Sequence, residues 1–449
     1  MTVKADFAAL VNALGLERSG QLVAIVGGGG KSSLMFSLAQ ALSGRVITTT
    51  TTRIFAVQMN QAPVVCNYPS QDMASCLEAG LEQFGHCLLV GAIQGDKATG
   101  IPVDLPGRLL AQGGVEYVLV EADGSRMKPV KAPAEDEPVI PPDANLVIPV
   151  AGIEAVGGRL GDIAHRPERV AQLTGLGLNE PLTVTALATL LSHPDAGLKN
   201  VPAGARVIPL INKVESAAQL SAARQVARQV LAQEQVDRVI IAAIHGRQPL
   251  REAHRRVTAV VLAAGESDRM GQTKQLLPWG DTTILGQVLA NIQASAVNEI
   301  VVVSGHDQQA VAQIAAEVGT STVYNPDYQA GEMLSSLQVA VGQLPPNREA
   351  VLVMLADQPL VGPEIINRLL EEYWRGGGEL IAPTFQGRRG NPVLIGRPYF
   401  NELLALSSGE APRTLIKSHA QDLKVVPVDS PGILQDMDTP GEYERWRPR

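Results

Sequence analysis

The sequence is poor in the features that define several classes of protein. Aromatic residues make up 4% of its 449 residues, and only three cysteines are present, at positions 66, 76 and 87. Because this number is odd and no C-x-x-C spacing occurs, we expect neither a disulfide framework nor a zinc site, and a reducing cytoplasm fits. No apolar run reaches the roughly 18 residues that a membrane-spanning helix needs. The net charge of −8 argues against a general nucleic-acid-binding or anionic membrane surface.

What remains is the composition of a soluble globular protein with large aliphatic cores. Hydrophobic residues make up 45% of the chain and charged residues 18%, which is the usual balance for such proteins. The first residues include the acidic Asp6 and no long apolar core, so no signal peptide is predicted. A chain of this length favours more than one domain.

Short β-branched runs alternate with helical stretches along the whole chain, which predicts parallel α/β sheets. The polar, basic segment 245–256 separates two such runs and marks a boundary. We therefore expect two doubly wound, mostly parallel α/β domains, residues 1–250 and 256–449, the first with a helical subdomain near 165–200. The predicted strands are 22–26, 45–48, 87–90, 117–120, 146–150, 207–211 and 239–244 in the first domain, and 257–262, 300–303, 351–355 and 380–382 in the second.

The most informative stretch is residues 262–274, LAAGESDRMGQTK, directly after an apolar run. Small residues let backbone amides approach a ligand, and Arg269 and Lys274 add cations that suit phosphate, at the predicted start of a helix. Alanines in place of glycines show that this is not a Walker loop. The residues expected against the nucleotide are Leu262, Ala263, Ala264 and Gly265.

Acidic residues later in this domain are candidate metal ligands. Asp357 follows the predicted strand 351–355, and ligands in open α/β sheets sit at the carboxyl ends of strands. A carboxylate there suits Mg²⁺, which takes one or two carboxylates plus substrate phosphates. Asp436 or Asp438 could complete the site, and an acidic turn leading into a helix at Pro440 is the equal alternative. Ser335 begins a predicted helix and could contact base or ribose, or act as a cap.

Residues 257–449 resemble the molybdenum cofactor cytidylyltransferases, a branch of the MobA-like nucleotidyltransferases. The matching segments, in family order, are LAAGESDRMGQTKQLLPWG, NPDYQAGEMLSSL, LADQPL, RRGNPVL and DMDTPGEY. The resemblance implies transfer of CMP from CTP to the phosphate of molybdopterin, with release of pyrophosphate. Within the family the Ala-Ala-Gly form of the loop goes with CTP, so residues 263–265 imply CTP. A GTP-using or a sugar-phosphate nucleotidyltransferase is the alternative.

The same resemblance implies roles for single residues. The acceptor phosphate is already ionised, so no general base is required, and catalysis rests on positioning and charge. Arg269 and Lys274 would hold the triphosphate, and Mg²⁺ on Asp357 would bridge phosphate oxygens. Arg389 and Asn391 lie in a loop with donors for a pterin phosphate. Residues 408–413, SGEAPR, replace the usual G-D-x-G-x-R loop, which puts the acceptor's identity in question.

The first domain carries a second phosphate loop after strand 22–26. Gly27 to Gly30 run into Lys31, Ser32 and Ser33, a pattern that cradles phosphate and Mg²⁺. It lacks the first glycine of a Walker A loop and resembles the shorter loop with which Mur ligases bind ATP. ATP or GTP is expected there, with Ser32, Glu121 and Asp123 as metal-holding residues.

Asn212 and Lys213 resemble the guanine-reading N-K-x-D of GTPases, with Glu215 in place of Asp, although a plain loop is an equal interpretation. Residues 20–245 resemble the YqeC family, accessory proteins of selenium-dependent molybdenum hydroxylases, through GGGGKSS, TTTTTRIF, VEADGSRMKPVKAPAEDEPVIPP and HRPERV. This implies a bifunctional cofactor-maturation protein whose partners are molybdopterin and an apo molybdenum hydroxylase of the xanthine dehydrogenase type. A nucleotide-gated cofactor carrier or chaperone is the alternative for this half. Lys128, Lys131, His165 and Arg166 are either substrate-side groups or solvated surface.

Overall fold

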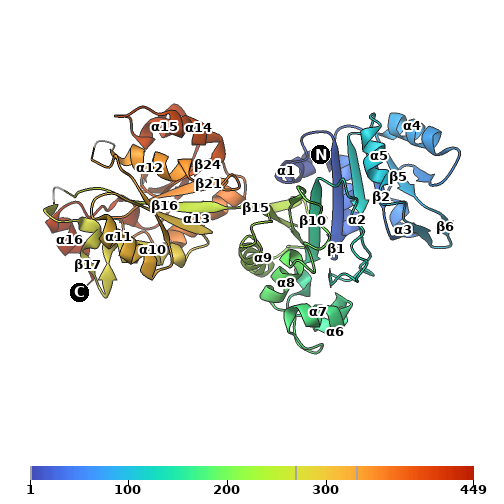
Figure 1. Ribbon diagram of the computed structural model, residues 1–449, viewed down its shortest axis with the longest axis horizontal. Coiled ribbons are helices and arrows are strands. Elements are labelled where there is room, and N and C mark those ends of the chain that lie inside the picture. The colour runs from blue at the N-terminus through green and yellow to red at the C-terminus, as the bar shows by residue number, and fades with distance from the viewer. Residues whose placement is uncertain (1–2, 268–269, 330–331, 449) are drawn as a thin grey trace. The chain divides into compact units, whose positions relative to one another are not determined.

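A largely parallel sheet forms the centre of each of the two units into which the chain divides (Figure 1). In the computed structural model, which describes residues 3–267, 270–329 and 332–448, unit 1 comprises residues 1–254 and unit 2 comprises residues 255–449. The predicted α/β class is confirmed in both units, and every predicted strand lies within or overlaps a strand of the structure.

In unit 1, β1 (Gln21–Gly27) lies between β10 (Leu146–Gly152) and β8 (Tyr117–Glu121) and is parallel to both. The described sheet has the order β15-β14-β13-β10-β1-β8-β2-β5-β4, with β12 beside β10. The connections from β1 and from its neighbour therefore lead to opposite sides of the sheet, which leaves a crevice at the carboxyl ends of these strands. Open α/β sheets bind their ligands in such a crevice. The other strands are β2 (Val46–Thr50), β4 (Val65–Asn67), β5 (His86–Val90), β12 (Arg206–Val207), β13 (Leu210–Asn212), β14 (Arg238–Ala242) and β15 (Leu250–Arg255).

Helices cover both faces of this sheet. Val23 and Ile25 of β1 pack on one face with α1 (Val3–Ala13) and α2 (Lys31–Ala41), while Leu22 and Ala24 pack on the opposite face with α4 (Met73–Phe84) and α5 (Leu105–Ala111). This alternation follows from the period of two along a strand. A third core lies under α8 (Val184–Ser192) and α9 (Ala217–Val230), next to the small helices α6 (Leu160–Ile163) and α7 (Pro167–Thr174).

In unit 2, β16 (Val257–Ala263) lies between β19 (Glu299–Ser304) and β21 (Ala350–Leu355), again parallel to both. The described order is β20-β19-β16-β21-β24-β22-β23, with β25 beside β22, and β24 runs antiparallel to its neighbours. The remaining strands are β20 (Ser321–Tyr324), β22 (Leu380–Phe385), β23 (Arg388–Arg389), β24 (Val393–Gly396) and β25 (Leu423–Pro427). The chain order again reverses beside β16, so the ends of β16 and β21 flank a crevice.

Helices of unit 2 also lie on both faces. One core joins Ala259 and Val261 to α10 (Ile284–Gln293), α11 (Gln308–Glu317) and α13 (Pro363–Trp374). The other joins Val260 to α12 (Glu332–Gly342), α14 (Phe400–Ala405) and α15 (Pro412–Ser418).

The segment 245–256, in which the domain boundary was predicted, contains the division between the two units and is partly a strand. Leu250–Arg255 form β15, whose buried positions alternate along the chain and include Glu252 and His254. These buried polar side chains are paired, since Arg224 of α9 donates to Glu252 at 2.6 Å and His254 lies 2.9 Å from the same carboxylate. The sequence did not predict this strand, because a strand whose buried face is ionic has the polar composition of a solvated segment.

The sequence led us to expect no disulfide framework, and the structure corrects this by one bond. Cys66 and Cys76 are disulfide-bonded, and Cys87 is free and buried. β4 and the first turn of α4 lie side by side, which brings the two Cα atoms to 5.9 Å, within the usual range for a disulfide. The spacing along the sequence does not reveal this proximity.

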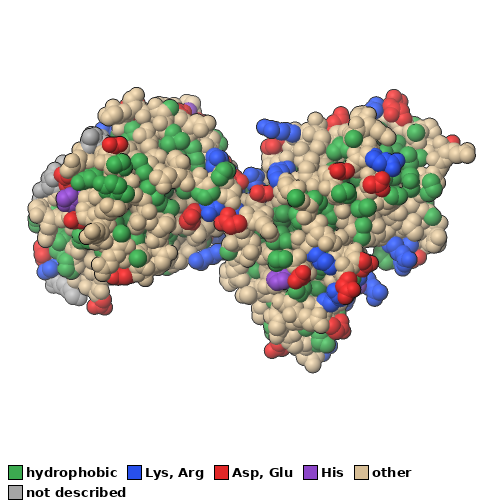
Figure 2. All heavy atoms as spheres, viewed as in Figure 1, with side chains coloured by type: hydrophobic (Ala, Val, Ile, Leu, Met, Phe, Trp, Pro, Cys, Tyr) green, Lys and Arg blue, Asp and Glu red, His purple; other side chains and the backbone are tan. Residues whose placement is uncertain are grey.

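On the face visible in Figure 2, Lys and Arg side chains are interspersed with Asp and Glu. Within the described part of the chain, no helix combines the length and apolarity needed to cross a bilayer.

Candidate functional site

A pocket with about 740 Å³ of empty space opens at the carboxyl ends of β16 and β21. The loop after β16, the loop after β21 and α12 supply its walls. Most of the residues predicted from the signature loop therefore meet in one place. The lining residues are Leu262, Ala263, Ala264, Gly265, Lys274, Gln275, Tyr328, Met333, Ser336, Leu355, Ala356 and Asp357.

Lys274 joins the two predicted acidic segments of unit 2. Its ammonium donates to Asp357 Oδ2, and at 2.5 Å to Asp438 Oδ1. The backbone N–H of Met437 donates to the carbonyl of Asp357 at 3.1 Å, which fixes the segment 436–438 beside the end of β21. Residues distant in sequence thus form one cluster of a cation and two carboxylates.

Asp436 stands beside this cluster. It accepts a hydrogen bond from Gln358 Nε2 at 2.5 Å, and burial, followed by the charge of Asp357, raises its pKa. Burial opposes the charge on Lys274, but Asp357 and Asp438 outweigh it and raise the pKa of the ammonium. Lys274 is therefore a cation at neutral pH. Among the residues that the structure describes, no group of three or more His, Cys, Asp or Glu side chains is arranged to hold a metal ion.

The loop that presents Lys274 is braced by side chains rather than by a helix. Ser267 Oγ accepts from the N–H of Lys274 at 3.1 Å, and Gln275 Nε2 donates to the carbonyls of Ala263 and Gly265 at 3.1 and 3.3 Å. The helix predicted at the end of this loop is wrong. In the described residues that follow, a 3-10 turn, Lys274–Leu276, leads into a hairpin of β17 (Pro278–Trp279) and β18 (Thr282–Thr283) before α10 begins. Arg269 lies outside the described residues.

The serines of α12 are tied to the segment before it. Asn325 Nδ2 donates to Ser335 Oγ at 2.9 Å and to Ser336 Oγ at 3.0 Å. Asn325 Oδ1 accepts in turn from the N–H of Asp327 at 3.0 Å. Ser336 lines the pocket, whereas Ser335 is not among the lining residues. Sequence reasoning missed Met333 as a pocket wall, because nothing in its spacing marks it.

The predicted acceptor loop, residues 388–391, is not part of the pocket lining and instead contacts the segment at Ile433. Arg388 and Arg389 form the exposed strand β23, and Asn391 N–H donates to the carbonyl of Ile433 at 3.1 Å. A Cβ on Gly390 would lie 2.1 Å from that same carbonyl oxygen, so the two backbones touch. This contact couples loop 388–391 to the segment that carries Asp436 and Asp438. In loop 408–413, whose sequence differs from the usual family loop, Glu410 accepts a hydrogen bond from the N–H of Ser407 at 2.7 Å.

A second candidate site lies at the end of β1 in unit 1. Gly27 N–H donates to both oxygens of Asp123, at 3.1 and 3.0 Å. Lys31 is buried, donates to the carbonyl of Gly27 at 2.7 Å, and pairs with Asp123 at 3.3 Å and Glu121 at 3.5 Å. Burial opposes its charge, but Asp123 and Glu121 raise the pKa of Lys31. The loop therefore holds a charged lysine against two carboxylates.

Ser32 links this loop to two other elements. Its hydroxyl donates to Glu121 Oε2 at 2.7 Å and accepts from Gln58 Nε2 at 2.6 Å, a residue of α3 (Ala56–Met59) that sequence reasoning missed. Ser33 Oγ lies 3.2 Å from Nε2 of His245. Gly29 has φ +73°, and a Cβ there would lie 2.2 Å from the N of Gly152, so the position requires glycine.

Asn212 and Lys213 make structural contacts near this loop. Asn212 Nδ2 donates to the carbonyl of Gly29 at 2.8 Å, and its Oδ1 accepts from the N–H of Ile244 at 3.2 Å. The ammonium of Lys213 pairs with Glu154. Asn212 thus holds the glycine loop against the end of β14, which accounts for its burial without a bound base.

Two family models match the chain, one within each unit. Residues 23–168 match the family model of the YqeC protein, and residues 259–424 match the MobA-like NTP transferase domain. The uncharacterized protein YqeC of Escherichia coli (strain K12) is 35% identical over 46% of this chain and 82% of its own length.

Two further relatives match about as much of the chain. The molybdenum cofactor cytidylyltransferase of Escherichia coli (strain K12) is 26% identical over 42% of this chain and 93% of its own length. The crystal structure of Rv0371c from Mycobacterium tuberculosis H37Rv is 31% identical, covers 42% of this chain and 97% of its own, and has a TM-score of 0.38.

Proposed function

We propose that this chain, which belongs to the YqeC family and carries a MobA-like NTP transferase domain in unit 2, acts in molybdenum cofactor maturation through two separate sites. Unit 2 is a nucleotidyltransferase. We propose that it transfers CMP from CTP to a molybdopterin-type cofactor, and that unit 1 binds ATP or GTP in an accessory role. The proposal for unit 2 rests chiefly on one observation, the cluster in which Lys274 joins Asp357 and Asp438 at the rim of the pocket.

The reaction needs charge to be neutralised more than it needs a base. An oxygen of the acceptor phosphate attacks the α-phosphorus of CTP, the bond from that phosphorus to the bridging oxygen breaks, and pyrophosphate leaves with the electron pair. Lys274 is cationic and stands at the pocket rim, so it can stabilise charge on the triphosphate. The small residues 263–265 allow the backbone to approach the nucleotide.

The acidic residues of the cluster fit a divalent cation. Asp357 and Asp438 already share one cation, the Lys274 ammonium, and carboxylate oxygens suit Mg²⁺ with the remaining ligands taken from phosphates. Bound there, Mg²⁺ would offset the repulsion between the two anionic substrates. Lys274 would then move from the carboxylates to the phosphates.

The choice of CTP is supported by the Ala-Ala-Gly form of residues 263–265 and by the similarity to a cytidylyltransferase. The test is pyrophosphate release from CTP, GTP, ATP and UTP, each with and without molybdopterin and Mg²⁺. We expect release from CTP alone, and only with molybdopterin. Release from GTP, or from CTP with a sugar phosphate as acceptor, would reject the stated substrates.

Variants of the cluster make this test specific. Asp357→Asn and Lys274→Ala should each lower turnover about 100-fold or more, because the first removes a carboxylate that would hold Mg²⁺ and the second removes a cation from the reacting phosphates. Lys424→Ala is the matched control, since Lys424 is ion-paired with Glu372 at 3.3 Å on β25 and lies outside the pocket lining. Equal activity of the three variants would contradict the assigned roles.

For unit 1 we propose that Gly27, Gly30 and Lys31 hold the phosphates of a nucleoside triphosphate. The first turn of α2 adds backbone N–H groups and the positive end of the helix dipole. Ser32, Glu121 and Asp123 are the residues that would hold Mg²⁺, because the Ser32 hydroxyl and the Glu121 carboxylate already lie together. The apo form of a molybdenum hydroxylase is the proposed partner.

Nucleotide binding to unit 1 can be measured with fluorescent ATP and GTP. Lys31→Ala should abolish it, whereas Lys97→Ala, which alters an exposed lysine of β7 (Lys97–Thr99), should not. Steady hydrolysis that is unaffected by apo-hydroxylase would support an NTPase. Binding without turnover until the apo-hydroxylase is added would favour the nucleotide-gated carrier.

A further inference from the structure

Gln58 contacts the phosphate loop of unit 1 from a separate small sheet. It belongs to α3, which directly follows β3 (Arg53–Phe55), and its Nε2 donates to Ser32 Oγ at 2.6 Å. β3 pairs with β7, and β7 pairs with β6 (Ile93–Gln94), so α3 is attached to a three-stranded sheet outside the main one. Figure 1 shows α3 and β6 together next to β2. The small sheet therefore reaches the phosphate loop through the side chain of Gln58.

The amide group of Gln58 has a defined orientation. Its Oε1 accepts a hydrogen bond from the N–H of Phe55 at 3.0 Å. A backbone N–H can only donate, so the oxygen of the amide faces Phe55 and the NH₂ group faces Ser32. Gln58 is therefore a donor to the Ser32 hydroxyl, and Ser32 is the acceptor.

This contact leaves the Ser32 hydroxyl with one remaining lone pair. Its proton is donated to Glu121 Oε2 at 2.7 Å, and one lone pair accepts from Gln58. Because a hydroxyl has one proton and two lone pairs, a single lone pair is left for a ligand. The two hydrogen bonds together fix the direction in which this lone pair points.

The segment that leads to α3 is anchored to Glu121 as well. Thr50 Oγ1 donates to the carbonyl of Glu121 at 2.9 Å, and the N–H of Thr51 donates to the same carbonyl at 3.3 Å. The threonine run between β2 and β3 thus joins the end of β2 to the end of β8. Both partners of the Ser32 hydroxyl, Gln58 and Glu121, are therefore held by the same part of the structure.

The oxygen atoms around this hydroxyl suit Mg²⁺. Ser32 directly follows Lys31 of the glycine loop, the position from which a phosphate loop supplies a hydroxyl to Mg²⁺. Glu121 and Asp123 add carboxylates, and Mg²⁺ usually takes one or two carboxylates together with phosphate oxygens and water. The remaining lone pair of Ser32 is the one that such an ion would use.

We propose that Gln58 is a positioning residue of the nucleotide site in unit 1, which holds the Ser32 hydroxyl so that its remaining lone pair faces Mg²⁺. The inference rests on the proposed function of unit 1, since it concerns the metal of that nucleotide site. Gln58 acts through Ser32 and does not touch the nucleotide. Removal of a group that orients a metal ligand typically lowers metal affinity about 10–100-fold.

The test measures the affinity of the full chain for fluorescent ATP or GTP, first in EDTA and then during a titration with Mg²⁺. Gln58→Met keeps a side chain of similar length and removes the donor. We expect the Mg²⁺ concentration that gives half of the gain in nucleotide affinity to rise about ten-fold. The affinity in EDTA should stay unchanged, because the phosphate contacts of the loop are intact.

A double-mutant cycle separates this role from a role in the folding of α3. Ser32→Ala should itself weaken the response to Mg²⁺, because it removes the hydroxyl. If Gln58 acts through Ser32, then Gln58→Met should add no further effect in the Ser32→Ala background. An effect of equal size in both backgrounds would show that Gln58 supports only the fold of α3.

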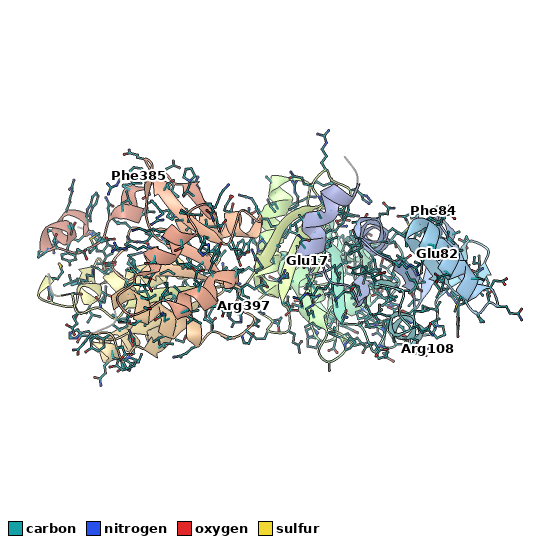
Figure 3. All side chains as sticks on the ribbon, turned by 90° about the horizontal axis from the view of Figure 1, so that it is seen from above. Glu17, Glu82, Phe84, Arg108, Phe385 and Arg397 are labelled. Carbon is teal, nitrogen blue, oxygen red and sulfur yellow. A yellow bond between two sulfur atoms is a disulfide. The ribbon has the colours of Figure 1, made fainter. Side chains whose placement is uncertain are left out.

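Two control variants accompany the test. Gln61→Met makes the same substitution at an exposed glutamine three positions further along the chain. Arg108→Ala alters an exposed side chain of α5 that pairs with Asp104 at 3.2 Å, and Figure 3 shows it at the periphery of unit 1. Both controls should respond to Mg²⁺ as the wild-type chain does.

Three further results would overturn the inference. They are nucleotide binding that does not depend on Mg²⁺, an unchanged Mg²⁺ response in Gln58→Met, and an equal loss of affinity in EDTA and in Mg²⁺, which would place Gln58 on the nucleotide itself. Failure of the wild-type chain to bind either nucleotide would instead reject the proposed function of unit 1, and this inference with it.

Discussion

Gly390 shows how a single residue can control the acidic cluster of unit 2 from outside the pocket. Its backbone touches the carbonyl of Ile433, and the segment that follows supplies Asp436 and Asp438. The position has no left-handed φ, so any requirement for glycine is purely steric.

Gly390→Ala should therefore displace that segment. We expect a loss of about 1–3 kcal/mol in stability, the usual cost of overpacking, together with lower pyrophosphate release. Urea unfolding and the release assay measure the two effects. Gly441→Ala is the control, because a Cβ at Gly441 meets no atom within 4 Å and the residue lies in α16 (Pro440–Trp446). Equal behaviour of the two variants would contradict the steric argument.

His86 gives unit 1 a pH-dependent stability. The residue is buried, lies 2.9 Å from Thr48 Oγ1, and burial lowers its pKa from 6.5 to about 4. The unfolded chain therefore binds a proton more readily than the folded chain between these values. Neutral His86 thus contributes up to about 3 kcal/mol to the free energy of unfolding of unit 1. This contribution is fully present above pH 6.5 and is lost as the pH falls towards 4. His165 acts in the same direction but is more exposed.

His86→Gln should flatten this dependence. All three tryptophans, Trp279, Trp374 and Trp446, belong to unit 2, so their fluorescence serves as an internal control. Urea unfolding at pH 7 and pH 5 should show the difference by circular dichroism and not by tryptophan fluorescence. An unchanged pH dependence in the variant would show that another group is responsible.

At the scale of elements, β15 depends on a buried ionic network. Burial alone would raise the pKa of Glu252, but His254 and Arg224 hold it down to about 2. The three side chains lie between β15 and α9, and they allow a polar strand to occupy the edge of the sheet. A strand of this kind is stable only while every charge has its partner.

Glu252→Ala should destabilise unit 1 by about 3 kcal/mol, because it leaves Arg224 and His254 without their carboxylate. Arg251→Ala, on the exposed face of the same strand, should cost less than about 0.5 kcal/mol. Thermal unfolding of both variants provides the comparison. A small effect of Glu252→Ala would show that β15 does not depend on the network.

The elements also show where sequence patterns stop being informative. Apolar β-branched runs located the central strands of both sheets, because burial on both faces demands such residues. The 3-10 turn Lys274–Leu276 is held by hydrogen bonds from the Gln275 side chain to the signature loop, and the hairpin of β17 and β18 follows it. Neither has a periodicity that could distinguish it from the start of a helix.

At the scale of the whole molecule, the cores are confined to single units. The clusters around β1 contain only residues of unit 1, and those around β16 contain only residues of unit 2. Arg255 belongs to unit 2, where it pairs with Glu379 at 2.7 Å and stacks 3.8 Å from the centre of the Tyr373 ring.

A fragment of residues 255–449 should therefore fold and keep CTP-dependent pyrophosphate release. A fragment of residues 257–449 should be less stable, because it lacks the Arg255 contacts with Glu379 and Tyr373. Tryptophan fluorescence during urea unfolding compares them. Loss of activity in the longer fragment would mean that unit 2 needs unit 1 for its reaction.

The sequence by itself determined the α/β class, the central strands and the positions of the two small-residue loops at the ends of β1 and β16, because these depend on local periodicity and on residue types at short spacing. Tertiary structure alone decided that Lys274, Asp357 and Asp438 meet, that Asn212 holds the glycine loop, and that Gln58 reaches Ser32. It also decided the disulfide and the ionic strand β15. Apart from the disulfide, which joins residues ten positions apart, these features join residues from distant parts of the chain, and such contacts follow from strand order and packing rather than from any local pattern.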